Sequence, residues 1–149
     1  MELRQLEETL NQVRTRYSIR LYSGNRSILQ PCIIENIESG RNYYLSTLLK
    51  YLKALGFTLK LNDLIIEDLV TLGNFLRTLR ENAGLSMNQV KSSRNKRLRE
   101  VKQLEEGSGG SRTTFLGYIN ELQNNNINLD FKLIDNYGIT KGQEGFEDP

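Results

Sequence analysis

A repeat at a spacing of 67 residues constrains the fold of this chain more than any other feature of its sequence. Residues 37–40 (IESG) align with residues 104–107 (LEEG), and the alignment continues downstream without a gap. The positions that match downstream are Thr47, Tyr51 and Leu55 in the first copy and Thr114, Tyr118 and Leu122 in the second. The chain therefore carries the same small unit twice.

The repeat extends in both directions from this segment. Upstream, Arg14 corresponds to Arg80 at a spacing of 66 residues. The two copies therefore differ there by small insertions in their loops. Downstream, residues 57–61 (FTLKL) and residues 127–133 (INLDFKL) alternate between apolar and polar side chains. Because this period is typical of a half-buried strand, we expect a short β-strand to close each copy.

Length and composition limit the class of protein. A chain of 149 residues can hold two units of about 65 residues, each of which is small for independent stability. The 38% of hydrophobic and 26% of charged residues are typical of a soluble globular protein. The sequence shows neither an apolar run long enough to span a bilayer nor a signal peptide, and it has one cysteine, Cys32. We expect a bacterial cytoplasmic protein that does not bind membranes.

Apolar spacing predicts several amphipathic helices in each copy. The first helix of each copy is indicated by Leu3, Leu6, Leu10 and Val13 and by Leu72, Phe75, Leu76 and Leu79. In the second copy, residues 82–84 (NAG) predict a helix end with Gly84 in the left-handed conformation. Ser86 and Gln89 then predict a capping box that opens the next helix. We expect four to five short helices in each copy.

Basic residues concentrate in residues 91–102 (KSSRNKRLREVK), which hold six basic residues and one acidic residue. The whole chain has a net charge of only +2. A basic run is often just a solvated surface. This run, however, lies at a turn and at the start of a predicted helix, where it would suit insertion into a DNA major groove beside phosphates.

The second copy resembles a known family in the spacing of particular apolar, basic and glycine residues. These positions are Leu76-Arg77, Leu79-Arg80, Gly84-Leu85-Ser86, Val90, Val101, Glu105 and Gly107. Their pattern resembles the lambda-repressor-like helix-turn-helix family, also called XRE or Cro-type regulators. The first copy resembles the family mainly in its second half, at Ile34, residues 37–40, Leu45, Leu48 and residues 55–56.

The resemblance implies a mainly α fold built from two tandem helix-turn-helix units, each closed by a short β-strand. Strands 57–61 and 127–133 would then pair as those of two subunits do, and one chain would form a pseudo-dimer. Residues 1–66 would form a degenerate helix-turn-helix unit, and residues 67–134 would form a unit whose DNA-contacting segment is basic. The polar residues 135–149 would form a flexible tail.

Several positions depart from the family pattern. In the second copy, Lys91 stands where the family has a small Ala, Asn95 replaces a turn Gly, and Lys96 replaces a buried Val. In the first copy, residues 25–32 lack the Gly and Val of the turn and include Pro31. We therefore expect an altered turn in the second copy and, in the first, a DNA-contacting segment that has lost much of the family pattern.

The resemblance places base-reading residues at the start of the second helix of each motif. An Arg there can contact guanine, a Gln can contact adenine, and a Glu can accept from cytosine. The candidates are Arg97, Leu98, Arg99, Glu100 and Gln103 in the second copy and Gln30 and Asn36 in the first. Phosphate contacts are expected from Asn88, Arg94, Lys96, Arg41 and Asn42.

Other polar residues favour structural roles. We expect Glu38 and Glu105 to cap a neighbouring turn or to pair with an arginine such as Arg14 or Arg80. Residues 107–111 (GSGGS) lack the spacing of a phosphate-binding loop and are interpreted as a flexible loop.

Catalysis has little support in the composition. The chain has no histidine, which is the commonest general base near neutral pH and the commonest zinc ligand. A single cysteine does not form a thiolate metal cluster. We expect no enzymatic activity, no cofactor and no metal.

Two functional hypotheses remain. In the first, the protein is a transcriptional regulator that reads double-stranded DNA at the nucleoid and spans two unequal half-sites about one helical turn apart. In the second, DNA reading is partly or wholly lost, and the fold binds a protein such as a toxin or another regulator. Residues 91–102 favour the first hypothesis. The low net charge and the loss of the family pattern in the DNA-contacting segment of the first copy favour the second. Either way, the chain would be a monomeric pseudo-dimer or a homodimer.

Overall fold

The computed structural model describes residues 1–17, 22–23, 26–27, 29–91, 97–141 and 143–149. The helices of this part are α1 (Leu3–Arg16), α2 (Pro31–Glu38), α3 (Leu45–Leu55), α4 (Leu69–Asn82), α5 (Met87–Val90), α6 (Leu98–Glu106) and α7 (Arg112–Asn124). Its strands are β1 (Tyr22–Ser23), β2 (Arg26–Ser27), β3 (Phe57–Leu61), β4 (Leu64–Ile66), β5 (Phe131–Asp135) and β6 (Phe146–Glu147). The fold is therefore mainly helical with a four-stranded sheet.

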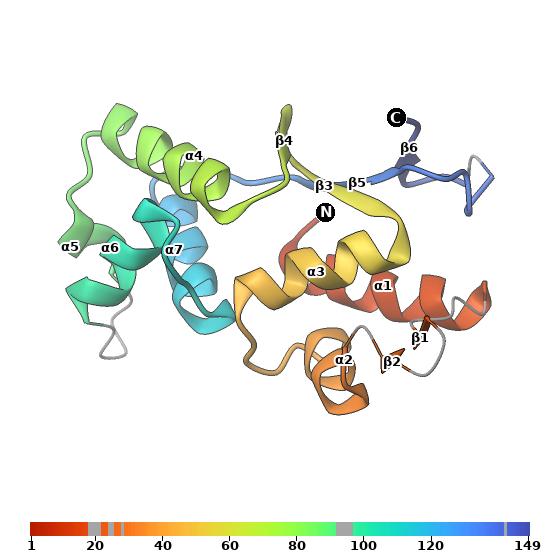
Figure 1. The fold of residues 1–149 in the computed structure, drawn as a ribbon. Helices are drawn as coiled ribbons and strands as arrows, with labels where there is room; N and C mark the ends of the chain where they lie inside the picture. Colours follow the sequence, from red (N-terminus) through yellow and green to blue (C-terminus); the bar gives the residue numbers. More distant parts are fainter. Residues whose placement is uncertain (18–21, 24–25, 28, 92–96, 142) are drawn as a thin grey trace.

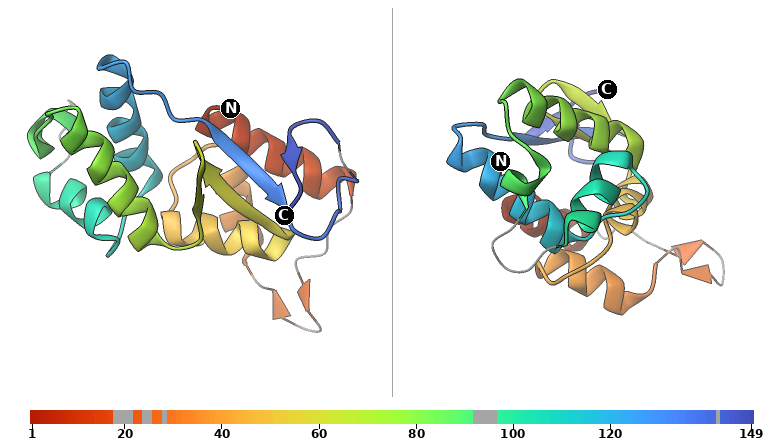
Figure 2. Two further views of the ribbon diagram at one scale, coloured as in Figure 1. Left: turned by 90° about the horizontal axis from the view of Figure 1, so that it is seen from above. Right: turned by 90° about the vertical axis from the view of Figure 1, so that its left-hand side faces the viewer.

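The helices form two groups joined by the sheet (Figure 1). Helices α4, α5, α6 and α7 gather at one end of the molecule, whereas α1 and α3 lie against one face of the sheet (Figures 1 and 2). Helix α2 and the hairpin β1–β2 lie on the far side of α1 and α3 from the sheet. We call residues 1–66 the first half and residues 67–134 the second half.

The two halves are joined through β3 and β5, at the centre of a sheet with the order β4-β3-β5-β6. Strands β3 and β5 are antiparallel, with Leu59 opposite Leu133 and Leu61 opposite Phe131. These side chains are buried, so alternation along both strands turns one face of the sheet towards the helices. The predicted pairing between the strands of the two copies is thus observed.

The bounds of the second strand differ from the prediction. Strand β3 occupies the predicted residues 57–61, but β5 spans Phe131–Asp135 rather than residues 127–133. The N–H of Ile127 donates to the carbonyl of Leu122 at 2.9 Å, and Asn126 adopts a positive φ of 62°. The first of the alternating residues therefore follow the end of α7 and cannot pair with β3.

Local signals in the second half were read correctly. Helix α4 ends at Asn82, and Gly84 has a left-handed φ of 70°. Ser86 and Gln89 form the predicted capping box, in which the Ser86 N–H donates to Gln89 Oε1 at 2.6 Å and the Gln89 N–H donates to Ser86 Oγ at 3.3 Å. Helix α5, which this box opens, is a single turn of four residues.

The prediction of four to five helices is wrong for the first half, where the described residues contain three. An antiparallel hairpin, β1–β2, stands between α1 and α2, with Tyr22 opposite Ser27. Its segment, residues 22–27 (YSGNRS), lacks the apolar stripe that a helix needs to bury one face. Helix α2 then begins at Pro31, whose fixed φ and missing N–H suit the first position of a helix.

The prediction of a flexible tail for residues 135–149 is also wrong over most of its length. Strand β6 pairs in parallel with β5, and the Phe146 ring stacks on Phe57 with 5.5 Å between the ring centroids. Asp135 is buried and accepts from the N–H of Ile139 at 3.1 Å and from the N–H of Thr140 at 2.8 Å. The segment is thus packed onto the sheet.

A buried carboxylate links the halves away from the sheet. Glu7 of α1 accepts from Arg112 at the start of α7 through two bonds, at 2.7 Å and 3.0 Å. The Tyr43 hydroxyl donates to the same carboxylate at 2.5 Å. Nearby, the N–H of Leu45 donates to the carbonyl of Gly110 at 2.9 Å, and the N–H of Arg112 donates to the carbonyl of Tyr43 at 2.8 Å. The predicted flexible loop 107–111 is therefore partly held by the first half.

Candidate nucleic-acid interface

Each half contains the same buried ion cluster. In the first half, Arg14 of α1 donates to both carboxylate oxygens of Glu38 in α2, from Nε at 2.7 Å and from Nη2 at 2.8 Å. The hydroxyl of Tyr51 in α3 donates to the same carboxylate. One carboxylate thus holds the three helices of this half together.

In the second half, the corresponding residues make the same contacts. Arg80 of α4 donates to Glu105 of α6 from Nε at 2.7 Å and from Nη2 at 2.9 Å, and the Tyr118 hydroxyl of α7 donates to it at 2.7 Å. These residues lie 66 or 67 positions after their counterparts. Of the two roles considered for Glu38 and Glu105, pairing with an arginine is confirmed.

The tyrosine and arginine of each cluster keep their protons. Burial raises the pKa of Tyr51 and of Tyr118 well above the ordinary tyrosine value, and the adjacent glutamates raise it further. The hydrogen bonds to Glu105 raise the pKa of the Arg80 guanidinium despite its partial burial. Each tyrosine is therefore a donor and each arginine is charged near neutral pH.

The second cluster fixes α6 against α4. Arg80 also donates from Nη1 to the carbonyl of Leu85, which ties the turn after α4 to the same cluster. The two helices meet at Gly73, where a Cβ atom would lie 2.4 Å from the carbonyl oxygen of Glu105. Gly107 closes α6 with a left-handed φ of 74°. The C-terminal half of α6 is thus held firmly, and its N-terminal end faces outward.

The predicted base-reading residues of the second half lie at that N-terminal end. Arg97 is the N-cap residue of α6, and Leu98 and Arg99 follow in its first turn. All three side chains are exposed, while Val101 is buried beneath them. Neither arginine forms an ion pair with the part of the chain that the structure describes. The structure brings these residues together on one solvent-facing end of a helix.

Glu100 and Gln103 are less accessible than the arginines. Both are half-buried, and the Oε2 atom of Glu100 is buried without a hydrogen-bond partner among the described residues. Burying such an oxygen costs free energy, so this carboxylate would gain from a donor brought by a ligand or a partner. Sequence reasoning marked Glu100 as a base reader but gave no sign that it is partly covered.

The predicted phosphate-binding residues differ in their surroundings. Asn88 is exposed on α5, next to α6. Arg94 and Lys96 lie outside the residues that the structure describes. Arg41 is exposed and 3.9 Å from the carboxylate of Glu35.

Asn42, another predicted phosphate-binding residue, instead links the two halves. Its Oδ1 accepts from the N–H of Thr113 at 3.2 Å and from the Thr113 hydroxyl at 2.9 Å.

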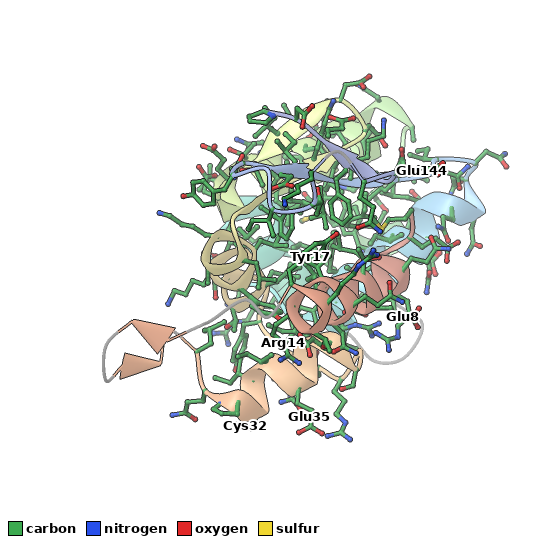
Figure 3. The ribbon with its side chains drawn as sticks, turned by 90° about the vertical axis from the view of Figure 1, so that its right-hand side faces the viewer. Glu8, Arg14, Tyr17, Cys32, Glu35 and Glu144 are labelled. Atoms are coloured by element: carbon green, nitrogen blue, oxygen red, sulfur yellow. The ribbon has the colours of Figure 1, made fainter. Side chains whose placement is uncertain are left out.

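The first half presents a different surface at the equivalent place. Gln30 is the exposed N-cap residue of α2, and Asn36 is half-buried nearly two turns further along the helix. Helix α2 contains no Lys or Arg. Figure 3 shows Cys32 and Glu35 on its outer side, pointing away from the body of the protein. The two predicted base readers of this half are therefore set among apolar and acidic residues.

The Glu7–Arg112–Tyr43 link was missed by sequence reasoning. Its residues lie 105 and 36 positions apart, and no local pattern relates them. A buried glutamate on the apolar stripe of α1, between Leu6 and Leu10, was the available signal, because a charge at such a position needs a partner.

Comparison of the chain with protein-family models, with curated proteins and with solved structures found no match in any of the three. In the described part of the chain, no group of three or more Asp, Glu or Cys residues is arranged to hold a metal ion. The described helices include none that is long and apolar enough to cross a membrane.

Proposed function

We propose that the protein is a sequence-specific regulator that binds double-stranded DNA through the second half. The observation that carries this proposal is the N-terminal end of α6, where Arg97 and Arg99 are exposed and lack ion-pair partners among the described residues. Arginine is the residue that most often reads guanine, because its two N–H groups match the O6 and N7 atoms in the major groove.

The geometry around α6 supports a helix-turn-helix role. Helices α4, α5 and α6 follow one another with a turn at Gly84 and a cap at Ser86. In such a motif the second helix enters the major groove and the first lies across the backbone. Exposed Asn88 on α5 suits a phosphate contact, and the ion cluster around Glu105 would hold the reading helix at a fixed angle.

The first half would contribute less to base reading. Its α2 carries no basic residue, and a hairpin occupies the place of the preceding motif helix. Pairing of β3 with β5 nevertheless ties it to the second half as a pseudo-dimer. We therefore expect an asymmetric operator in which one half-site carries most of the sequence information.

A second candidate, a protein-binding module, is favoured by a different observation. The apolar residues Leu64 and Ile65 of the edge strand β4, and Val70 at the start of α4, are exposed. Exposed apolar side chains on an edge strand can receive a partner chain. Such a partner could be a toxin or another regulator.

Fluorescence anisotropy of the protein with a random-sequence duplex pool, titrated over salt, separates the two candidates. A steep salt dependence and an enriched motif among the bound duplexes would support DNA reading. No binding at low salt would exclude it and favour the protein partner.

Replacement of Arg99 tests the reading residue. Arg99→Ala should cost about 1–3 kcal/mol on the selected duplex and relax the sequence preference at one position. The matched control is Lys50→Ala, which removes an exposed cation from α3 in the other half. An equal loss on every sequence would show that Arg99 contacts only phosphate.

A further inference from the structure

A cavity lies beside α3, on the side of this helix that faces the β3–β4 hairpin. Its volume is about 420 Å³, within the range of small-molecule sites. Apolar side chains form much of its wall, and they are Leu49, Leu52, Phe57, Leu59 and Ile66. Polar groups also line it, and they are Lys53, Thr58, Glu67, Asn136 and Tyr137.

The repeat supplies an internal comparison for this cavity. A second cavity is lined by Leu116, Ile119 and Asn120 of α7, which lie 67 residues after Leu49, Leu52 and Lys53 of α3. Both cavities are also lined by a strand that follows the helix and by the segment that opens a helix of the other half. The two cavities are therefore equivalent places in the two halves.

The equivalent cavities differ in size. The second has a volume of about 90 Å³, because the start of α1 enters it with the buried side chain of Leu3. At the first cavity, the residue that corresponds to Leu3 is Leu69, which is only half-buried and does not line the space, whereas the exposed residue Glu67 does. The same place in the fold is therefore larger in the first half than in the second.

The cavities also differ in whether the charged side chains that line them form ion pairs. In the smaller cavity, Arg4 is 3.4 Å from Glu7 and 3.5 Å from Glu8, so its charge is neutralised within the protein. In the larger cavity, Lys53 and Glu67 form no ion pair with the described residues. One cation and one anion thus line a partly apolar space without forming an ion pair with each other.

We propose that this cavity binds a small zwitterion with an apolar body, such as an amino acid with an apolar side chain. The ligand carboxylate would pair with Lys53, the ligand ammonium would pair with Glu67, and the apolar body would lie against Leu49 and Phe57. Glu67 is followed by Asp68, the N-cap of α4, whose side chain accepts from the Thr71 N–H at 2.7 Å. A ligand at Glu67 therefore lies beside the entry to the helix that packs on α6.

The chain contains no tryptophan, so Tyr137→Trp places a single reporter at the cavity. Tyr137 is exposed, and the change preserves an aromatic ring there. Three probes are titrated while tryptophan emission is followed: L-phenylalanine, 3-phenylpropanoate, which lacks the ammonium, and phenethylamine, which lacks the carboxylate. We expect saturable binding of L-phenylalanine about fivefold tighter than that of either analogue, because each analogue loses one exposed ion pair.

Two further substitutions in the reporter background assign the charges. Lys53→Gln should abolish the advantage of L-phenylalanine over phenethylamine, and Glu67→Gln should abolish its advantage over 3-phenylpropanoate. Asn120→Ala, in the smaller cavity, is the matched control and should leave all three affinities unchanged. Lys53 and Glu67 are exposed, so these variants are expected to fold.

Absence of saturable binding, or equal affinities for the three probes, would overturn the proposal. An effect of Asn120→Ala equal to that of Lys53→Gln would also overturn it. The titrations contain no DNA, so their outcome is independent of the proposed DNA-binding function.

Discussion

The two halves keep the same buried ion cluster but differ in the segment between its first two helices. Glu38 is held by Arg14 and Tyr51, and Glu105 is held in the same way by its own arginine and tyrosine. Between α1 and α2 stands the hairpin β1–β2, whereas a helical turn, α5, stands between α4 and α6. The comparison teaches that a carboxylate on one helix can keep the same hydrogen bonds to two others while the segment beside it changes.

The halves also differ in how far the cluster is shielded from solvent. The Arg14 side chain is 34% exposed, whereas the Arg80 side chain is 11% exposed. The half with the candidate reading helix therefore has the more buried cluster. Since solvent weakens ion pairs, the second cluster should contribute more to stability than the first.

The largest effect is expected where the halves meet, at Glu7. Glu7→Gln would leave the mostly buried guanidinium of Arg112 without its counter-charge, and such a loss costs about 3–5 kcal/mol. Urea unfolding followed by circular dichroism measures this change. Because Glu7 joins α1 to α7, we expect one cooperative transition in the unmodified protein and a lower midpoint in the variant.

The neighbouring residue Glu8 provides the control for Glu7. Its side chain is 56% exposed and lies 3.5 Å from Arg4, so Glu8→Gln should cost no more than about 0.5 kcal/mol. Two separate transitions in the unmodified protein would show that the halves are stable independently, which would contradict the role assigned to Glu7.

The second prediction compares the two clusters directly. Glu105→Gln should lower the free energy of unfolding by about 3 kcal/mol, because it leaves Arg80 unpaired in a more buried place. Glu38→Gln should cost about 2 kcal/mol, since the more exposed Arg14 can be hydrated. Urea unfolding of both variants at one pH measures the difference.

Glu106→Gln is the control for the cluster comparison, because Glu106 is exposed and lies 3.9 Å from Lys102. It should change the free energy of unfolding by less than about 0.5 kcal/mol. If Glu38→Gln proved the more costly change, the link between burial and cluster strength would be refuted.

The part of the fold that was predicted from sequence depends on local interactions. The helix end at Gly84, the capping box at Ser86 and strand β3 each follow from residues within one turn or one strand. Strand β5 was misplaced because alternation begins at Ile127, while the backbone there still completes the end of α7. The hairpin β1–β2 was missed because the repeat favoured a helix where the residues do not support one.

The two candidate sites, the start of α6 and the cavity beside α3, also differ in whether the sequence could predict them. The family resemblance placed Arg97 and Arg99 at the start of a helix, and α6 begins between them at Leu98, so the exposed arginines were named in advance. The cavity was not, because its walls come from α3, from the β3–β4 hairpin and from Tyr137, which are far apart in the sequence. Only the folded chain shows that this space is large and that its counterpart beside α7 is small.

The smallest expected effect concerns the ends of the two central strands. Strand β3 turns directly into β4, whereas β5 leads into a longer segment that is held by Asp135. Burial alone would raise the pKa of Asp135, but hydrogen bonds from Thr140 and from the N–H of Ile139 outweigh it and lower the pKa. The carboxylate therefore stabilises the fold above its unfolded pKa of about 3.9, and this contribution is lost as pH falls through the lower folded pKa.

Asp135→Asn should cost about 1–2 kcal/mol at pH 7, because bonds to a charged acceptor become bonds to a neutral one. The difference from the unmodified protein should shrink below about pH 4, because Asp135 becomes protonated in the unfolded chain there while the folded carboxylate stays charged to lower pH. Thr58→Val is the control, since Thr58 Oγ1 accepts from Asn136 Nδ2 at 2.8 Å and neither group titrates. Its cost should stay constant between pH 7 and pH 3 in urea unfolding, and a cost of Asp135→Asn that was equally constant would mean that the charge of Asp135 does not hold this segment.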